Sequence, residues 1–114
     1  MRSLLLFLAA AAIMSSMPSL ADTMALSTAA ATQIQIDNYT FKPASVTIPV
    51  GATVTWKNLD DDPHTATADD GSFNSKGLAQ GDTYSHTFTK PGTYHYHCTV
   101  HPFMQATIVV KEAN

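Results

Sequence analysis

Cysteine is nearly absent from this 114-residue chain, since Cys98 is its only one. A single cysteine excludes an internal disulfide, so the thiol is buried and inert, paired with another chain, or protected by a metal. Basic residues are also scarce, with six Lys and Arg against nine Asp and Glu and a formal net charge of −3. This mildly acidic balance argues against nucleic acid as a partner.

No apolar run in the sequence reaches the length of about 20 residues that a membrane-spanning helix needs. The longest, from Leu4 to Met14, follows the basic residue Arg2 and precedes Ser19-Leu20-Ala21, which fits the cleavage rule of a secretory signal. We therefore expect residues 1–21 to be a signal peptide and the protein to be periplasmic, with no membrane anchor after cleavage. An uncleaved anchor is the alternative, but no stop-transfer charges follow the short apolar run.

The sequence from residue 33 onward has the periodicity of β-strands. Residues 22–32 are small and polar, and we expect them to form a flexible leader before a single domain at 33–114. Apolar and polar residues then alternate in several segments, and no segment has the 3.6-residue period of a helix. Seven or eight short strands at about ten-residue spacing predict an all-β antiparallel sandwich or barrel. The segment NYTFKP, residues 38–43, is expected to be a turn-like connection.

A cluster of metal-binding residue types lies near the C-terminus. Cys98, His101 and Met104 are spaced three residues apart, and Pro102 prevents this loop from forming a regular helix. Taken alone, each is more often structural than a ligand. Together, thiolate, imidazole and thioether favour copper, and zinc rarely takes a thioether. A blue-copper site needs a second histidine, and His64 is the best candidate, because loops at one end of a sandwich can meet across 34 residues.

The loop C-T-V-H-P-F-M, preceded by N-x5-H from Asn58 to His64, resembles the cupredoxins. It is most similar to the amicyanin group, in which the loop reads C-T-P-H-P-F-M. The resemblance covers about Gln33 to Lys111, including VTIPVGATVTW and FTKPGTYHYHC. It implies a Greek-key β-sandwich that binds one type 1 copper ion, cycling between Cu(I) and Cu(II), at one end.

The resemblance also implies roles for individual residues. It makes Asn58 the residue that ties the two ligand loops together near the thiolate, and it brings the ring edge of His101 to the surface. Val100 replaces a proline of the amicyanin loop, and its backbone N–H is expected to point at the Cys98 sulfur. The implied copper ligands are His64, Cys98, His101 and Met104.

These features predict an exported blue-copper electron carrier rather than an enzyme. Pro63, Pro102 and Phe103 are expected to form an apolar docking patch around His101 for transient redox partners. The resemblance suggests an amine dehydrogenase and a c-type cytochrome as candidate partners of a monomer. The acidic run at residues 60–62 is expected to be a solvated loop that steers a basic partner.

Two alternatives come from other classes of protein. The pair His97-Cys98 and the motif His95-x-His97 also resemble copper nitrite reductases and multicopper oxidases, where such histidines bind further copper. Thr99 stands where the oxidases have another histidine, so we expect His95 and His97 to face solvent and His86 to be hydrogen-bonded and partly buried. A periplasmic copper chaperone or buffer is the second alternative, but the remaining methionines all lie in the predicted signal or leader.

Overall fold

The computed structural model describes residues 31–112, so the predicted signal peptide and residues 22–30 of the predicted leader lie outside the described residues. Eight strands occupy this range, which agrees with the predicted number. They are β1 (Ala31–Asp37), β2 (Thr40–Lys42), β3 (Ser45–Pro49), β4 (Thr53–Asn58), β5 (Thr67–Ala68), β6 (Thr83–Thr87), β7 (Gly92–His97) and β8 (Gln105–Lys111). Within residues 31–112 no helix has the length and hydropathy to cross a membrane.

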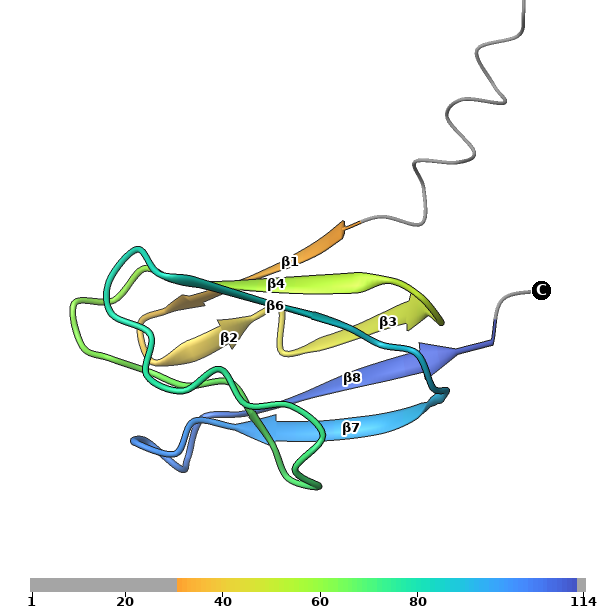
Figure 1. Cartoon of the computed structure of the whole chain (residues 1–114). Helices are drawn as coiled ribbons and strands as arrows, with labels where there is room; N and C mark the ends of the chain where they lie inside the picture. Colours follow the sequence, from red (N-terminus) through yellow and green to blue (C-terminus); the bar gives the residue numbers. More distant parts are fainter. Residues whose placement is uncertain (1–30, 113–114) are drawn as a thin grey trace, which may run out of the picture.

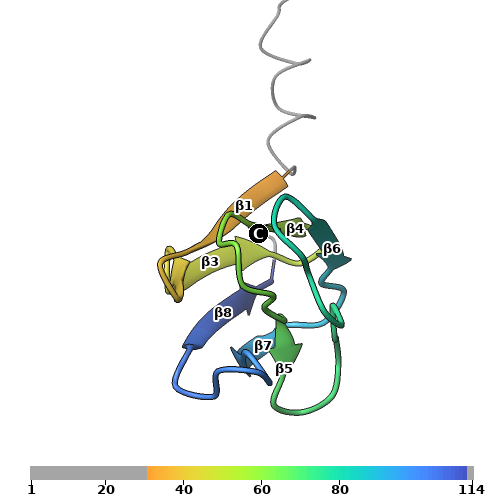
Figure 2. The ribbon, with the colours of Figure 1, turned by 90° about the vertical axis from the view of Figure 1, so that its left-hand side faces the viewer.

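The strands form two four-stranded sheets that pack face to face, as the predicted sandwich requires. One sheet has the order β2-β1-β4-β6 and the other the order β3-β8-β7-β5. Figure 1 shows the two layers, with the loops after β4 and β7 at the same end of the sandwich and the C-terminus near the other end. Figure 2 looks directly at this loop end.

The prediction of an antiparallel sandwich is correct for most strand pairs but not for all. Strands β1 and β4 are parallel, and so are β3 and β8, whereas the other pairs are antiparallel. The reason is that the chain crosses to the second sheet for β3 between β2 and β4. The chain therefore returns as β4 beside β1 and runs in the same direction. The alternation of apolar and polar residues does not indicate that crossing.

Two predicted boundaries are also wrong. Thr40–Lys42 lie in the segment expected to be a turn, but they form β2, which pairs with the end of β1. Strand β1 begins at Ala31, two residues inside the predicted leader, because Ala31 and Thr32 pair with Thr53 and Val54 of β4. In both places backbone pairing to a neighbouring strand outweighs a composition that is weak for strands.

The core is built from the alternating apolar residues that identified the strands. Ile36, Trp56 and Ile108 are at most 1% exposed, and the Trp56 ring lies 5.5 Å from the ring of Tyr96 across the two sheets. On β7 and just after it, Tyr96 and Cys98 are buried while the histidines between and before them point outward. This confirms the predicted assignment of the two faces of this strand, and it points the thiol inward at the loop end.

His86 on β6 is half-buried, as predicted for a histidine that shares a face with Phe88. Its ring packs 5.2 Å from the ring of Phe73 and 4.8 Å from that of Phe88, measured between centroids. Burial between these apolar rings disfavours the imidazolium and lowers the pKa of His86 below its usual value.

The lowered pKa of His86 predicts a dependence of folding stability on pH. The unfolded chain takes up a proton on this histidine near pH 6.5, whereas the folded chain resists it until a lower pH. The free energy of unfolding should therefore fall as the pH drops below about 6.5, and His86→Gln should reduce that loss. Urea unfolding of the metal-free protein at pH 7.5 and pH 5.5 measures this. Equal losses in wild type and variant would contradict it.

Candidate metal centre

Two loops at one end of the sandwich bring together a thiol and two imidazoles. His64 lies on the loop between β4 and β5, and Cys98 and His101 lie on the loop between β7 and β8. One ligand atom from each residue lies within 4.8 Å of the others. The Cys98 Sγ atom is 3.7 Å from Nδ1 of His64 and 3.9 Å from Nδ1 of His101, and the two Nδ1 atoms are 3.1 Å apart.

Backbone hydrogen bonds hold both loops in this position. His64 N–H donates to the Leu78 carbonyl and Leu78 N–H donates to the His64 carbonyl, at 3.1 and 2.7 Å. Cys98 N–H donates to the Met104 carbonyl at 3.1 Å, and Met104 N–H donates to the His101 carbonyl at 2.9 Å. The second pair of bonds closes a tight loop, so three residues that are local in sequence are fixed around one point.

The residues of this cluster and Met104 differ in their exposure to solvent. His64 and Cys98 are fully buried, Met104 is 2% exposed, and His101 is half-buried. His101 is therefore the one residue of these four that is partly open to solvent, and the surface position that the resemblance implies for its ring stays a prediction. Sequence reasoning missed Tyr39, whose ring packs edge-on against both His64 and His101, with centroids 5.3 and 5.2 Å away.

The thiol receives a backbone hydrogen bond from the residue that follows His64. Thr65 N–H donates to Cys98 Sγ at 3.3 Å, and the Thr65 hydroxyl accepts the Thr99 N–H at 2.9 Å. Thr65 thus ties the two loops together, and only its position beside His64 could have indicated this. Among the hydrogen bonds of residues 31–112, the donor to the sulfur is Thr65 rather than Val100, whose side chain is 53% exposed.

Asn58 is fully buried beside the site, but its hydrogen bonds go elsewhere than the resemblance implied. Its side-chain amide donates to the carbonyls of Asp62 and Leu78, at 2.9 and 2.8 Å, and its oxygen accepts the Asp60 N–H at 3.0 Å. These bonds fix the shape of the His64 loop and attach it to the segment before β6. They do not reach the Cys98 loop, which Thr65 contacts instead.

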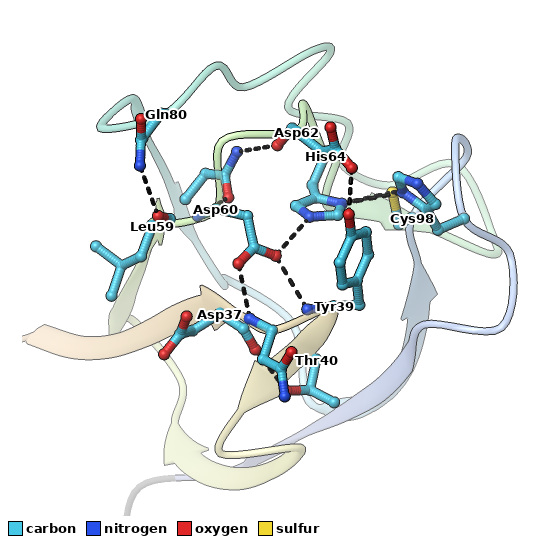
Figure 3. A network of polar contacts seen from close by, with 12 residues as sticks. Asp37, Tyr39, Thr40, Leu59, Asp60, Asp62, His64, Gln80 and Cys98 are labelled. Carbon is cyan, nitrogen blue, oxygen red and sulfur yellow. Dashed lines mark hydrogen bonds and ion pairs between the residues drawn. The ribbon is translucent and has the colours of Figure 1, made fainter.

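Asp60 is not part of a solvated acidic loop, so that expectation is wrong for this residue. Its side chain is only 11% exposed, and its Oδ2 atom lies 2.8 Å from Nε2 of His64. The same carboxylate accepts the N–H groups of Asn38 at 2.7 Å and Tyr39 at 2.9 Å (Figure 3). Burial opposes ionisation of Asp60, but the hydrogen bonds from Tyr39, Asn38 and His64 outweigh it and lower the pKa of the carboxyl. Asp61 is exposed, as predicted, but Asp62 is half-buried and its Oδ2 atom accepts the Tyr39 hydroxyl, so the expectation is wrong for Asp62 as well.

The three residues predicted to form a docking patch are all exposed, and one of them, Phe103, packs near His101. Pro63 and Pro102 are exposed, Phe103 is 71% exposed, and the Phe103 ring lies 6.0 Å from the His101 ring. Val100, which sequence reasoning did not assign to the patch, is a second large hydrophobic side chain exposed on the same loop, after Phe103.

The other histidines of β7 have partners of their own. His97 Nδ1 lies 2.6 Å from a carboxylate oxygen of Asp69, and the exposed His95 has its Nδ1 atom 3.1 Å from the Thr107 hydroxyl. Across residues 31–112, the cluster around Cys98 is the one group of three or more His, Cys, Asp or Glu side chains with ligand atoms this close together.

Comparison with known proteins finds a cupredoxin-like family and amicyanin relatives. The profile of the family described as "Cupredoxin-like domain" matches residues 4–110. Amicyanin-alpha of Methylorubrum extorquens is 38% identical over 88 residues, which cover 73% of this chain and 74% of that protein. Amicyanin of Paracoccus denitrificans is 34% identical over 83 residues, covering 68% of this chain but 63% of that protein, just under two thirds.

Solved structures with the same architecture include several copper proteins. A reduced mutant of amicyanin has a TM-score of 0.67 and 32% identity, covering 71% of this chain and 82% of that one. A purple cupredoxin from Nitrosopumilus maritimus has a TM-score of 0.65 and 34% identity, covering 70% and 99%. A copper-containing nitrite reductase from Thermus scotoductus has a TM-score of 0.68 and 34% identity, covering 73% of this chain but only 23% of that one.

The bond between Thr65 and Thr99 predicts a stability effect that is independent of metal. Thr65→Val keeps the backbone N–H that donates to Cys98 but removes the acceptor of the Thr99 N–H. We expect the free energy of unfolding of the metal-free protein to fall by about 1 kcal/mol. Thr53→Val is the matched control, because its hydroxyl bonds only the exposed Thr87 hydroxyl and should matter by less than about 0.5 kcal/mol. Equal effects of the two variants in urea unfolding would contradict the prediction.

Proposed function

Because this chain belongs to the cupredoxin-like domain family, we propose that it is a blue-copper electron carrier with His64, Cys98, His101 and Met104 as the copper ligands. The observation that carries the proposal is the convergence of a buried thiol and two imidazole Nδ1 atoms within 4.8 Å. The amicyanin and plastocyanin relatives support the same conclusion.

The donor set fits copper better than other metals. A thiolate and two imidazole nitrogens match the trigonal plane of a type 1 site, and a buried methionine sits on the same closed loop for a weaker thioether contact. When bound, the copper ion supplies a one-electron couple between Cu(II) and Cu(I). Zinc remains the poorer match, because zinc sites take Cys, His and carboxylate ligands and rarely a thioether such as that of Met104.

The protein contributes rigidity and exclusion of water. His64 and Cys98 are held by backbone hydrogen bonds on both loops, and Tyr39 covers the two imidazole rings. Ligand positions that are fixed by the fold change little when the charge of the site changes, so little rearrangement accompanies electron transfer. The hydrogen bond from Thr65 N–H to the Cys98 sulfur withdraws electron density from the thiolate and so favours the reduced state.

The half-buried ring of His101 provides the route to partners. Pro63, Pro102 and Phe103 are exposed around it, and Val100 extends the same apolar surface. Such a surface suits brief complexes, whose interfaces are small, below about 1,200 Å². An amine dehydrogenase and a c-type cytochrome are the candidate partners of a monomeric carrier. Steering of a basic partner depends on Asp61 more than on Asp60, because Asp60 is bound to His64.

The location is part of the same proposal. Residues 1–21 act as an export signal, residues 22–30 as a leader, and the domain that begins with β1 works in the periplasm. Relatives that are amicyanins and plastocyanins support this assignment. An oxidising compartment suits a chain whose single cysteine is fully buried and faces two imidazoles.

A carrier fits the site better than either alternative. A chaperone or buffer that exchanges copper needs an accessible site, whereas His64 and Cys98 are fully buried. A nitrite-reductase-like enzyme needs a second metal site besides the one at Cys98. The histidine that would serve there, His97, is paired with Asp69.

The proposed site predicts a visible spectrum. The wild-type protein should bind one copper ion per chain and show an intense thiolate-to-copper absorption band in its oxidised form. Cys98→Ser should lose this band completely, while circular dichroism still shows the β-sandwich. A colourless wild type, or two copper ions per chain by metal analysis, would overturn the proposed site.

The docking surface predicts a kinetic effect that is separate from the redox potential. Phe103→Glu places a charge on the apolar patch beside His101, so electron transfer to a partner protein should slow at least tenfold while the reduction potential changes little. Stopped-flow reaction with a c-type cytochrome measures the rate. His97→Ala is the comparison, because it tests an exit through the neighbour of Cys98. If His97→Ala slows electron transfer while Phe103→Glu leaves the rate unchanged, electrons leave the site through His97 and the prediction is wrong.

A further inference from the structure

The carboxylate of Asp60 can only act as an acceptor toward His64. Its Oδ1 atom accepts the Asn38 N–H, and its Oδ2 atom accepts the Tyr39 N–H while lying 2.8 Å from Nε2 of His64. Because both carboxylate oxygens already accept backbone N–H groups, the carboxylate bonds Nε2 as an acceptor, and the hydrogen lies on Nε2 of the imidazole. In the neutral imidazole the other ring nitrogen, Nδ1, then carries a free lone pair, and it is the atom that faces Cys98 Sγ at 3.7 Å.

From this geometry we propose that Asp60 is a positioning residue for the copper site, which fixes the tautomer of His64 and whose negative charge lowers the reduction potential. The inference rests on the proposed function, because it concerns the ligand His64. It differs from the four-ligand assignment in adding a charged group outside the ligand set. Neither the spacing of the ligands nor the loop C-T-V-H-P-F-M indicates that group.

The carboxylate is held in place by the turn between β1 and β2. Asn38 and Tyr39 have φ angles of 53° and 58°, in the left-handed region that only some residues adopt readily. In this conformation both of their N–H groups point at Asp60 (Figure 3). The same turn places the Tyr39 ring against both imidazoles, so one carboxylate connects the turn, the covering ring and the buried ligand.

Burial makes the charge of Asp60 more effective at His64 than the charge of the exposed Asp61 on the same loop. The Asp60 side chain is 11% exposed and the His64 side chain is fully buried, so little water screens the interaction between them. A carboxylate bonded to a metal-ligating histidine makes the imidazole a stronger donor. It therefore stabilises the more positive, oxidised state more than the reduced state. Asp61 is exposed to solvent, where water and salt screen its charge.

Asp60→Asn and Asp61→Asn form a matched pair that tests the proposal. Both variants remove one negative charge from the same loop, but only the first removes the group that contacts His64. Asp60→Asn should weaken Cu(II) binding about 10- to 100-fold, measured by competition with a chelator. A tenfold loss confined to Cu(II) corresponds to a rise in reduction potential of about 59 mV for a one-electron couple. Asp61→Asn should change both quantities far less.

A second measurement does not depend on whether the Asn variant folds. Long-range ¹H–¹⁵N NMR of the metal-free wild type should show His64 protonated at Nε2 and unprotonated at Nδ1. Asp60→Glu, which keeps the carboxylate on a longer arm, should have a potential nearer to wild type than Asp60→Asn. If Asp60→Asn does not fold, the tautomer of His64 in the wild type decides.

Three results would overturn the proposal. They are an Nδ1-protonated His64 in the metal-free protein, equal shifts of potential in Asp60→Asn and Asp61→Asn, and an Asp60→Glu variant as perturbed as Asp60→Asn. A wild type that binds no copper would instead overturn the proposed function, while the tautomer of His64 would still report on the contact with Asp60.

Discussion

The close approach of the fully buried Cys98 thiol to two imidazole nitrogens is the constraint on which the rest of the loop end depends. Three metal-binding side chains gain little from one another in the absence of a metal, so other contacts have to hold them there. The backbone bonds of His64 to Leu78 and of Cys98 to Met104 provide those contacts. The fold itself thus supplies contacts that hold the ligand side chains together, which suits a carrier whose site rearranges little.

The two ligand loops belong to different sheets, and this gives the site a structural role as well. His64 follows β4 of one sheet and Cys98 follows β7 of the other. A metal held by both loops would link the sheets at one end, where Thr65 already provides a hydrogen bond between them. Because ion binding favours the folded state by mass action, copper should stabilise the whole sandwich and not only its loops.

The parts of the structure that sequence reasoning predicted are those that depend on local patterns. Alternation of apolar residues located most strands, and the spacing of Cys98, His101 and Met104 pointed to one loop. The parts that it missed depend on residues far apart in the chain. Asp60 accepts backbone hydrogen bonds from a turn that lies 21 and 22 residues earlier in the chain. In the sequence alone, a run of three aspartates is typical of a solvated surface loop. The parallel pairing of β1 with β4 likewise follows from a crossover that residue types do not record.

The two histidines of the site differ in a way that suits them to different tasks. His64 is buried, bonded through Nε2 to Asp60 and covered by Tyr39, so its environment is set entirely by the protein. Tyr39 packs against His101 as well, but among the hydrogen bonds of residues 31–112 the His101 ring has only its contacts at the site. Its half-buried ring lies 6.0 Å from the ring of the exposed Phe103. The fold can therefore adjust the site from the inside through His64 without altering the surface at His101. A change on the partner-facing side, in turn, leaves the carboxylate that bonds His64 untouched, so potential and docking can vary independently.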